Sequence, residues 1–175
     1  MIALVPLSEP DREEFVGEEI ANYAEQQIRD AGWARAGALE RARSELLPEI
    51  ERELAEPEWR LWSARNEDGE TVGWLWVRPG ETPRSAFLYQ ITVAERFRWR
   101  GYGRAMLAAL EQRLAGEGIE ELALNVNVGN VPAQRLYAAA GYEQTADDGR
   151  VRRLRKRLVQ PIGHVDDDHP RLEEQ

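Results

Sequence analysis

The sequence predicts a mixed α/β fold, and two observations carry this prediction. In the first half of the chain, segments rich in valine and tryptophan flank Glu67-Asp68-Gly69, a turn that is typical of antiparallel hairpins. In the second half, strand-like runs alternate with segments in which leucine and alanine recur at helical spacing. Hairpins followed by strand–helix alternation indicate a mixed sheet rather than a doubly wound parallel one.

The N-terminal third is expected to hold one strand and two helical segments. An apolar run over residues 2–5 ends at Pro6 and reads as a short strand. Ser8 offers an N-cap, and the acidic residues after it favour a helix that begins near Pro10. Helical stretches are expected over residues 10–30 and 33–55, with interruptions near Gly32 and Pro48.

The remaining elements are bounded by glycine, proline and polar turns. Valine and aromatic residues predict strands, whereas Met106, Leu110 and Leu114 recur at helical spacing. Strands are expected over residues 60–65, 71–77, 86–93 and 121–128, and helices over residues 101–117 and 131–140. Two final strands, near Tyr142 and over residues 151–159, are expected around the turn at residues 147–149.

Length and charge limit the domain organisation and the partners. The 175 residues are expected to form one domain over residues 1–159 and an acidic tail over residues 160–175. A net charge of −9, from 32 acidic and 23 basic residues, argues against nucleic-acid binding. Arginines cluster at residues 96–104 and 150–157, which favours one anionic ligand held locally, with a solvated charged face as the alternative.

Several classes of protein are excluded by what the sequence lacks. No apolar run approaches the roughly 20 residues that span a bilayer, and the N-terminus has no secretory signal pattern. Without cysteine, the chain cannot form disulfides, thiolate metal sites or a cysteine nucleophile. His164 and His169 lie in the expected tail and are too few for a metal site. We therefore expect a cytoplasmic protein with no membrane contact and no metal.

The most informative segment is the strand that ends at Val93, the basic loop after it and the turn Gly101-Tyr102-Gly103, which opens a helix. Amides at a helix N-terminus converge on one point, where the helix dipole adds partial positive charge. The two glycines leave the backbone open to a ligand. Positive charge comes from Arg98, Arg100 and Arg104. This pattern indicates a pyrophosphate site, and a tight helix entry without a ligand is the alternative.

Two other nucleotide-binding turns are excluded by residue spacing. A Walker turn requires Gly-Lys followed by Ser or Thr, but the only lysine of the chain is Lys156. A dinucleotide-binding turn requires a small residue three positions after the second glycine, where Met106 stands.

Two motifs resemble a known family. Arg98-x-x-Gly101-x-Gly103, after a strand that ends in Ile91-Thr92-Val93, resembles motif A of the GNAT superfamily of N-acetyltransferases. Residues 124–142, which include Asn130 and Tyr137, resemble its motif B at a fitting spacing. The resemblance implies antiparallel N-terminal strands and a parallel pair that splays apart at the cofactor cleft, over residues 88–93 and 121–128, with flanking helices. Trp99 departs from the family pattern, and it either covers the phosphates or packs on the helix.

The resemblance also implies acetyl-CoA as co-substrate and a role for each matching residue. The amides of residues 98–104, including Tyr102, would hold the pyrophosphate. The backbone of Ile91 and Val93 would pair with the pantetheine arm, and an amide near Val93 would stabilise the oxyanion. Asn130 would contact pantetheine, cap the next helix, or both. Tyr137 would protonate the departing thiolate, or it is a core aromatic.

The implied activity is N-acetyl transfer by direct attack of an amine on acetyl-CoA in a ternary complex. No general base is apparent, because Gln90, Asn125 and Asn127 occupy the positions where related proteins often carry an acid. A water relay, or an acid outside the motifs such as Glu70 or Glu81, is left open. The expected partner is a small-molecule or peptide amine, and a homodimer stays open. The alternative function is a CoA-binding module without turnover.

Overall fold

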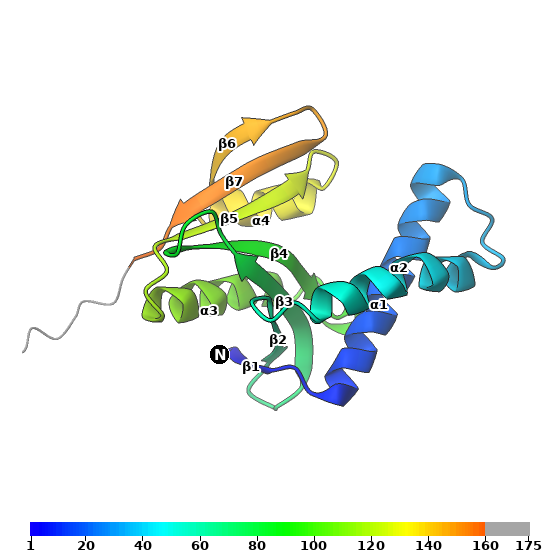
Figure 1. Ribbon diagram of the computed structural model, residues 1–175, viewed down its shortest axis with the longest axis horizontal. Coiled ribbons are helices and arrows are strands. Elements are labelled where there is room, and N and C mark those ends of the chain that lie inside the picture. The colour runs from blue at the N-terminus through cyan, green and yellow to red at the C-terminus, as the bar shows by residue number, and fades with distance from the viewer. Residues whose placement is uncertain (160–175) are drawn as a thin grey trace, which may run out of the picture.

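The computed structural model describes residues 1–159 and confirms the predicted mixed α/β fold. Within these residues, seven strands form one sheet in the order β1-β2-β3-β4-β5-β7-β6 (Figure 1). The strands are β1 (Ala3–Pro6), β2 (Arg60–Arg65), β3 (Thr71–Pro79), β4 (Ser85–Val93), β5 (Glu121–Asn127), β6 (Glu143–Asp147) and β7 (Val151–Arg157). The predicted tail over residues 160–175 lies outside the described residues.

Helices cover both faces of this sheet. They are α1 (Glu9–Ala31), α2 (Ala38–Leu54), α3 (Tyr102–Gly116) and α4 (Val131–Ala139). Helices α1 and α2 lie side by side (Figure 1), and Phe15 of α1 packs on Trp74 and Trp76. Helix α3 covers the opposite face, where a Cβ on Gly73 would lie 2.8 Å from Cε of Met106. The described residues contain no helix able to cross a membrane and no acidic or histidine cluster placed to hold a metal ion.

The second helix differs from its prediction at both points where the sequence suggested a boundary. Helix α2 begins at Ala38 rather than near Trp33, because Gly37 adopts a left-handed φ of 79° at the helix start. The helix also continues through Pro48 without an interruption. Ala42 and Ile50, on either side of Pro48, are buried, so packing offsets the helix hydrogen bond that proline cannot make.

The N-terminal end of α1 is fixed to the sheet through Asp11, which is 6% exposed. Its carboxylate accepts hydrogen bonds from the hydroxyls of Ser8 and Ser63 at 2.8 Å and of Thr71 at 2.9 Å. Nη2 of Arg65 lies 3.1 Å away. Burial raises the pKa of Asp11, but these four donors lower it more, to about 2. This network sets the direction in which α1 leaves the sheet.

The parallel strands β4 and β5 separate after a short paired stretch. They pair only from Ser85 opposite Glu121 to Leu88 opposite Leu124. Beyond these residues the two strands diverge (Figure 1). In β4 the register against β3 shifts, which leaves Tyr89 as the extra residue of a bulge. The predicted splayed pair is therefore present.

The last part of β4 turns backbone groups that do not pair with β3 toward this opening. The amide of Ala94 donates to the carbonyl of Val72 on β3 at 2.9 Å. Backbone groups of successive residues in a strand point to opposite edges. Those of Ile91 and Val93 therefore point away from β3, toward the side where β5 has left the sheet.

Candidate active site

An open cleft of about 490 Å³ lies at the end of β4, between the turn that leads into α3 and the start of α4. Arg100 and Asn130 do not line it. Seven of the nine residues predicted to bind a cofactor do: Ile91, Val93, Arg98, Gly101, Tyr102, Gly103 and Arg104. The sequence thus located one face of the cleft. It missed the contributions of Asn22 and Thr92, which complete the side toward α1.

The turn before α3 exposes its backbone to the cleft. It follows a single 3₁₀ turn (Glu95–Phe97), and Gly101 takes a left-handed φ of 80° at the helix start. Trp99 also has a left-handed φ, 64°, which a residue with a Cβ adopts only rarely. Its side chain lines the cleft and is 89% exposed. Trp99 therefore does not pack on the helix, one of the two roles considered for it.

Gly103 leaves a space that a larger residue would fill. A Cβ built on Gly103 would lie 3.6 Å from Cδ2 of Leu136 and 3.7 Å from Cγ2 of Val93. Both of these side chains line the cleft. The absence of a side chain here keeps the passage between β4, α3 and α4 open, as a narrow ligand arm requires.

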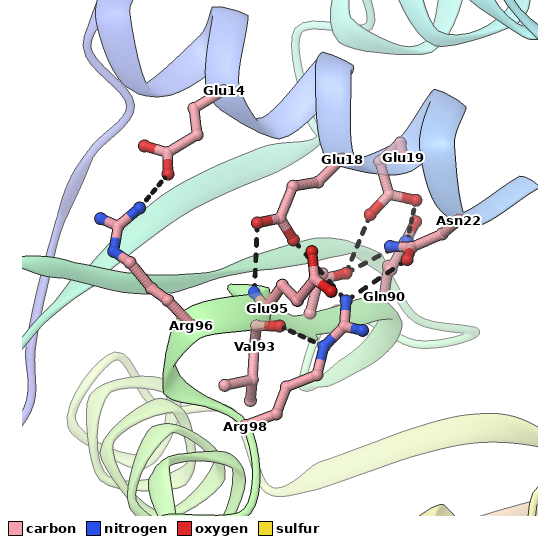
Figure 2. Close-up of polar contacts among 10 residues, drawn as sticks. Glu14, Glu18, Glu19, Asn22, Gln90, Val93, Glu95, Arg96 and Arg98 are labelled. Atoms are coloured by element: carbon pink, nitrogen blue, oxygen red, sulfur yellow. Dashed lines mark hydrogen bonds and ion pairs between the residues drawn. The ribbon is translucent and has the colours of Figure 1, made fainter. Parts of the chain in front are cut away.

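The arginines around the cleft have different partners. Nε of Arg98 donates to the carbonyl of Val93 at 3.1 Å, and Nη2 lies 3.3 Å from Oδ1 of Asn22 and 3.7 Å from Oε2 of Glu18 (Figure 2). Within residues 1–159, neither Arg100 nor Arg104 forms an ion pair. Arg98 thus joins β4 to α1, while the other two guanidinium groups can meet an anion at the helix N-terminus.

The two residues predicted from the second motif lie on or just before α4. The side chain of Asn130 accepts a hydrogen bond from the amide of Ala133 at 3.2 Å, so its predicted capping role is confirmed. Tyr137 is buried, and its ring packs edge-on against Tyr142 with centroids 5.6 Å apart. Burial raises the pKa of Tyr137 to about 12. Its hydroxyl is protonated at neutral pH, as that of an unshifted tyrosine also is, and Tyr137 is not among the residues that line the cleft.

The acids considered from sequence lie away from the cleft. Glu70 accepts a hydrogen bond from Nδ2 of Asn66 in the β2–β3 turn, and Glu81 forms an ion pair with Arg153. Neither lines the cleft. Acidic side chains near the cleft come instead from α1, through Glu18 and Glu19 (Figure 2). The four-residue spacing of Glu14, Glu18 and Asn22, which places them on one helix face, was a signal for Glu18, but it does not include Glu19.

The chain matches the model of the Acetyltransferase (GNAT) family over residues 25–142. It is 30% identical over 146 residues to the uncharacterized N-acetyltransferase YycN of Bacillus subtilis, covering 82% of this chain and 94% of YycN. It is 33% identical over 125 residues to an aminoglycoside N(6')-acetyltransferase type 1 of Serratia marcescens, covering 67% of this chain and 82% of that protein. The crystal structure of YycN matches with a TM-score of 0.68 over 84% of this chain and 95% of YycN.

These likenesses agree with the motifs and with the geometry. The family match spans the glycine turn before α3 and all of the second motif, and the YycN match covers most of the chain. They confirm the resemblance inferred from the motifs and support acetyl transfer as the general activity. The chain belongs to the Acetyltransferase (GNAT) family.

Proposed function

We propose that this protein transfers the acetyl group of acetyl-CoA to an amine of a small-molecule or peptide acceptor, by direct attack in a ternary complex. One observation carries the proposal. The backbone of Ile91 and Val93 faces the opening between β4 and β5, directly before the helix start that can hold an anion. A pantetheine arm can pair with this edge as an added strand, with its pyrophosphate at the α3 N-terminus.

The positions of these groups support the proposed binding roles. The amides of residues 98–104, including Tyr102, hold the pyrophosphate, and Arg100 and Arg104 add positive charge. The missing side chain at Gly103 admits the arm between Val93 and Leu136. Asn130 does not line the cleft, but it caps α4 just before the lining residues Pro132 and Ala133, and this position supports a contact with the same arm.

The chemical steps use one amide and one hydroxyl. The Val93 amide donates to the thioester oxygen and stabilises the negative charge that forms when the amine attacks the carbonyl carbon. The carbonyl of Val93, which lies in the next peptide unit, accepts from Arg98, and this contact holds the end of β4 in place. As the C–S bond breaks, Tyr137 gives its hydroxyl proton to the sulfur and regains a proton from solvent. With its pKa raised to about 12, Tyr137 carries this proton at neutral pH.

The acceptor is proposed to be cationic. Residues 9–58, which hold α1 and α2, carry 15 acidic and 6 basic residues, or a net −9, beside the end of β4. The Serratia marcescens relative is named for aminoglycosides, which carry several amines. A polyamine, an amino sugar and a peptide amine all share this chemistry. A cytoplasmic location and a homodimer stay predictions.

A second candidate is a CoA-binding module without turnover. This alternative arises because Gln90, Asn125 and Asn127, whose side-chain amides cannot act as a base, occupy the positions on β4 and β5 where related proteins often carry an acid. One screen separates the two. Wild-type protein is mixed with acetyl-CoA and a panel of polyamines, aminoglycosides and peptides, and released CoA is measured alongside the melting temperature. Release that depends on an amine supports the transferase. A melting shift with acetyl-CoA, without CoA release in the presence of any amine, supports the module. If both the shift and the release were absent, both candidate functions would be contradicted.

A further inference from the structure

A carboxylate from α1 lies against the part of β4 where the sequence offers no acid. Oγ1 of Thr92 donates to Oε1 of Glu19 at 2.9 Å, and Nε2 of Gln90 donates to Oε2. Figure 2 shows Glu18, Glu19 and Asn22 directed from α1 toward the end of β4. Thr92 and Asn22 both line the cleft. Glu19 is therefore held directly beside it, although it lies more than 70 positions before its partners in the chain.

The two hydrogen bonds orient the Glu19 carboxylate and leave each of its oxygens able to accept one more hydrogen bond. Each carboxylate oxygen can accept two hydrogen bonds, and Thr92 and Gln90 supply one donor to each. Nε2 of Gln90 also lies 3.3 Å from Oγ1 of Thr92, so the three side chains form a closed group. One lone pair on each oxygen of Glu19 is thus left for an external proton.

The surroundings of Glu19 favour proton uptake by its carboxylate. Burial raises the pKa of Glu19, the two hydrogen bonds lower it, and the neighbouring charges are Glu18, which raises it, and Arg98, which lowers it. The net shift is upward. A base acts best when its pKa approaches the working pH, so this direction suits proton uptake from an amine.

Two other acids near β4 are less suited to this role. Glu18 lies 3.7 Å from Arg98 and accepts from the amide of Glu95 at 3.2 Å, so a cation and an amide already face it. Glu53 of α2 accepts from the hydroxyl of Tyr89, a residue that does not line the cleft. Glu18 reaches the cleft wall through its ion pair with Arg98. Glu19, in contrast, accepts a hydrogen bond from the wall residue Thr92 and, within residues 1–159, faces no cation at this distance.

We infer that Glu19 is the general base of the acetyl transfer, an inference that rests on the proposed function. The acceptor nitrogen forms the N–C bond with the thioester carbon, and its proton passes to a carboxylate oxygen of Glu19. The C–S bond then breaks, the sulfur takes a proton from Tyr137, and Glu19 releases its proton to solvent. Helix α1 thus supplies the acid that the strand positions of Gln90, Asn125 and Asn127 lack.

The test compares full-length wild type, Glu19→Gln and Glu14→Gln with acetyl-CoA and the acceptor found in the screen, from about pH 5 to about pH 9. Glutamine keeps the size of Glu19 but cannot accept the proton. The kcat of Glu19→Gln is expected to fall about 10²-fold, and its kcat/KM to lose the rise with pH that the base produces. Glu14→Gln, on the same helix but paired with Arg96, should keep the wild-type profile.

Two measurements distinguish a folding defect in Glu19→Gln from a catalytic defect. The melting shift with acetyl-CoA should persist in Glu19→Gln, because the substitution leaves the cleft lining intact. In NMR spectra of wild type with ¹³C-labelled glutamate, the signal absent from Glu19→Gln should titrate above the usual glutamate range, as the raised pKa requires.

Distinct results would overturn the assignment. An unchanged kcat in Glu19→Gln would remove Glu19 from the chemistry. A higher KM for the amine at constant kcat would make it an acceptor-binding group instead. Loss of the pH dependence in Glu53→Gln rather than Glu19→Gln would move the role to α2. Absence of transfer by wild type with every amine would refute the proposed function itself, which the wild-type arm reports separately.

Discussion

Nε of Arg98 donates a hydrogen bond to the backbone carbonyl of Val93 at 3.1 Å, which ties the glycine turn to the end of β4. The same guanidinium reaches Asn22 and Glu18 on α1. The first arginine of the motif therefore acts inside the protein, across three elements. Its guanidinium holds the carbonyl of Val93, the residue whose own amide, in the preceding peptide unit, is proposed to face the thioester oxygen.

Replacing the planar guanidinium of Arg98 with the single ammonium group of lysine should weaken acetyl-CoA binding and lower turnover. Arg98→Lys keeps the positive charge but cannot reach the carbonyl, the amide and the carboxylate in the same planar arrangement. We expect the KM for acetyl-CoA to rise several-fold and kcat to fall, measured by steady-state kinetics. Arg96→Lys, in the same loop but directed at Glu14, is the matched control. Equal effects of both substitutions would indicate a general loss of charge rather than this contact.

Filling the space at Gly103 should abolish acetyl-CoA binding. In the wild type, acetyl-CoA at a hundredfold excess over its Kd should stabilise the fold by about 2.7 kcal/mol, a melting shift of about 5–10 °C. Gly103→Val should remove this shift, because its side chain would project between Val93 and Leu136. Gly116→Val, on the same helix with open space around its Cβ, should retain the shift. A full shift in Gly103→Val would contradict the proposed path of the arm.

Trp99 should report ligand binding by fluorescence. It lines the cleft, and among the six tryptophans, all within residues 1–159, it is the only exposed one. Acetyl-CoA should therefore change the tryptophan emission of wild type, and Trp99→Phe should lose most of that change. Binding measured independently by the melting shift serves as the control. If Trp99→Phe kept the full change in emission, the ligand would lie elsewhere.

Removing the hydroxyl of Tyr137 should affect turnover more than binding. Tyr137→Phe keeps the ring that packs on Tyr142 but loses the proton donor. We expect kcat to fall about 10²-fold with little change in the KM for acetyl-CoA. Tyr142→Phe is the matched control for the ring pair. If both variants kept wild-type kcat per folded molecule, Tyr137 would have only a packing role.

Protonation of Asp11 should lower the free energy of unfolding in acid. Its pKa is lowered from 3.8 to about 2, so the folded state favours the charged carboxylate. This contribution, about 2 kcal/mol, is fully present above about pH 4 and is lost as pH falls toward 2. Asp11→Asn should therefore be less stable at neutral pH and lose less stability between pH 4 and 2 in urea titrations. Asp30→Asn, at an exposed site, should behave as wild type.

Local patterns in the sequence were sufficient for most of the fold. Hairpin turns, helix caps and the spacing of apolar residues depend on neighbours a few positions apart, so they can be read along the chain. The course of α2 through Pro48 could not, because the burial of Ala42 and Ile50 outweighs the local signal for a break. The start of α2 at Ala38 depends on the left-handed backbone of Gly37, which the sequence pattern did not predict. The bulge at Tyr89 likewise depends on the register between two strands.

For the site, the sequence determined the glycine turn and the family to which it belongs, because Arg98, Gly101 and Gly103 lie within six residues of one another. Only the tertiary structure decided that Arg98 turns toward α1 and that Glu19 meets Thr92 and Gln90. Helix α1 carries no motif, and its position over β4 is set by the packing of Phe15 and by the hydrogen bonds of Asp11. Side chains more than 70 residues apart became neighbours through those contacts, which no local pattern encodes.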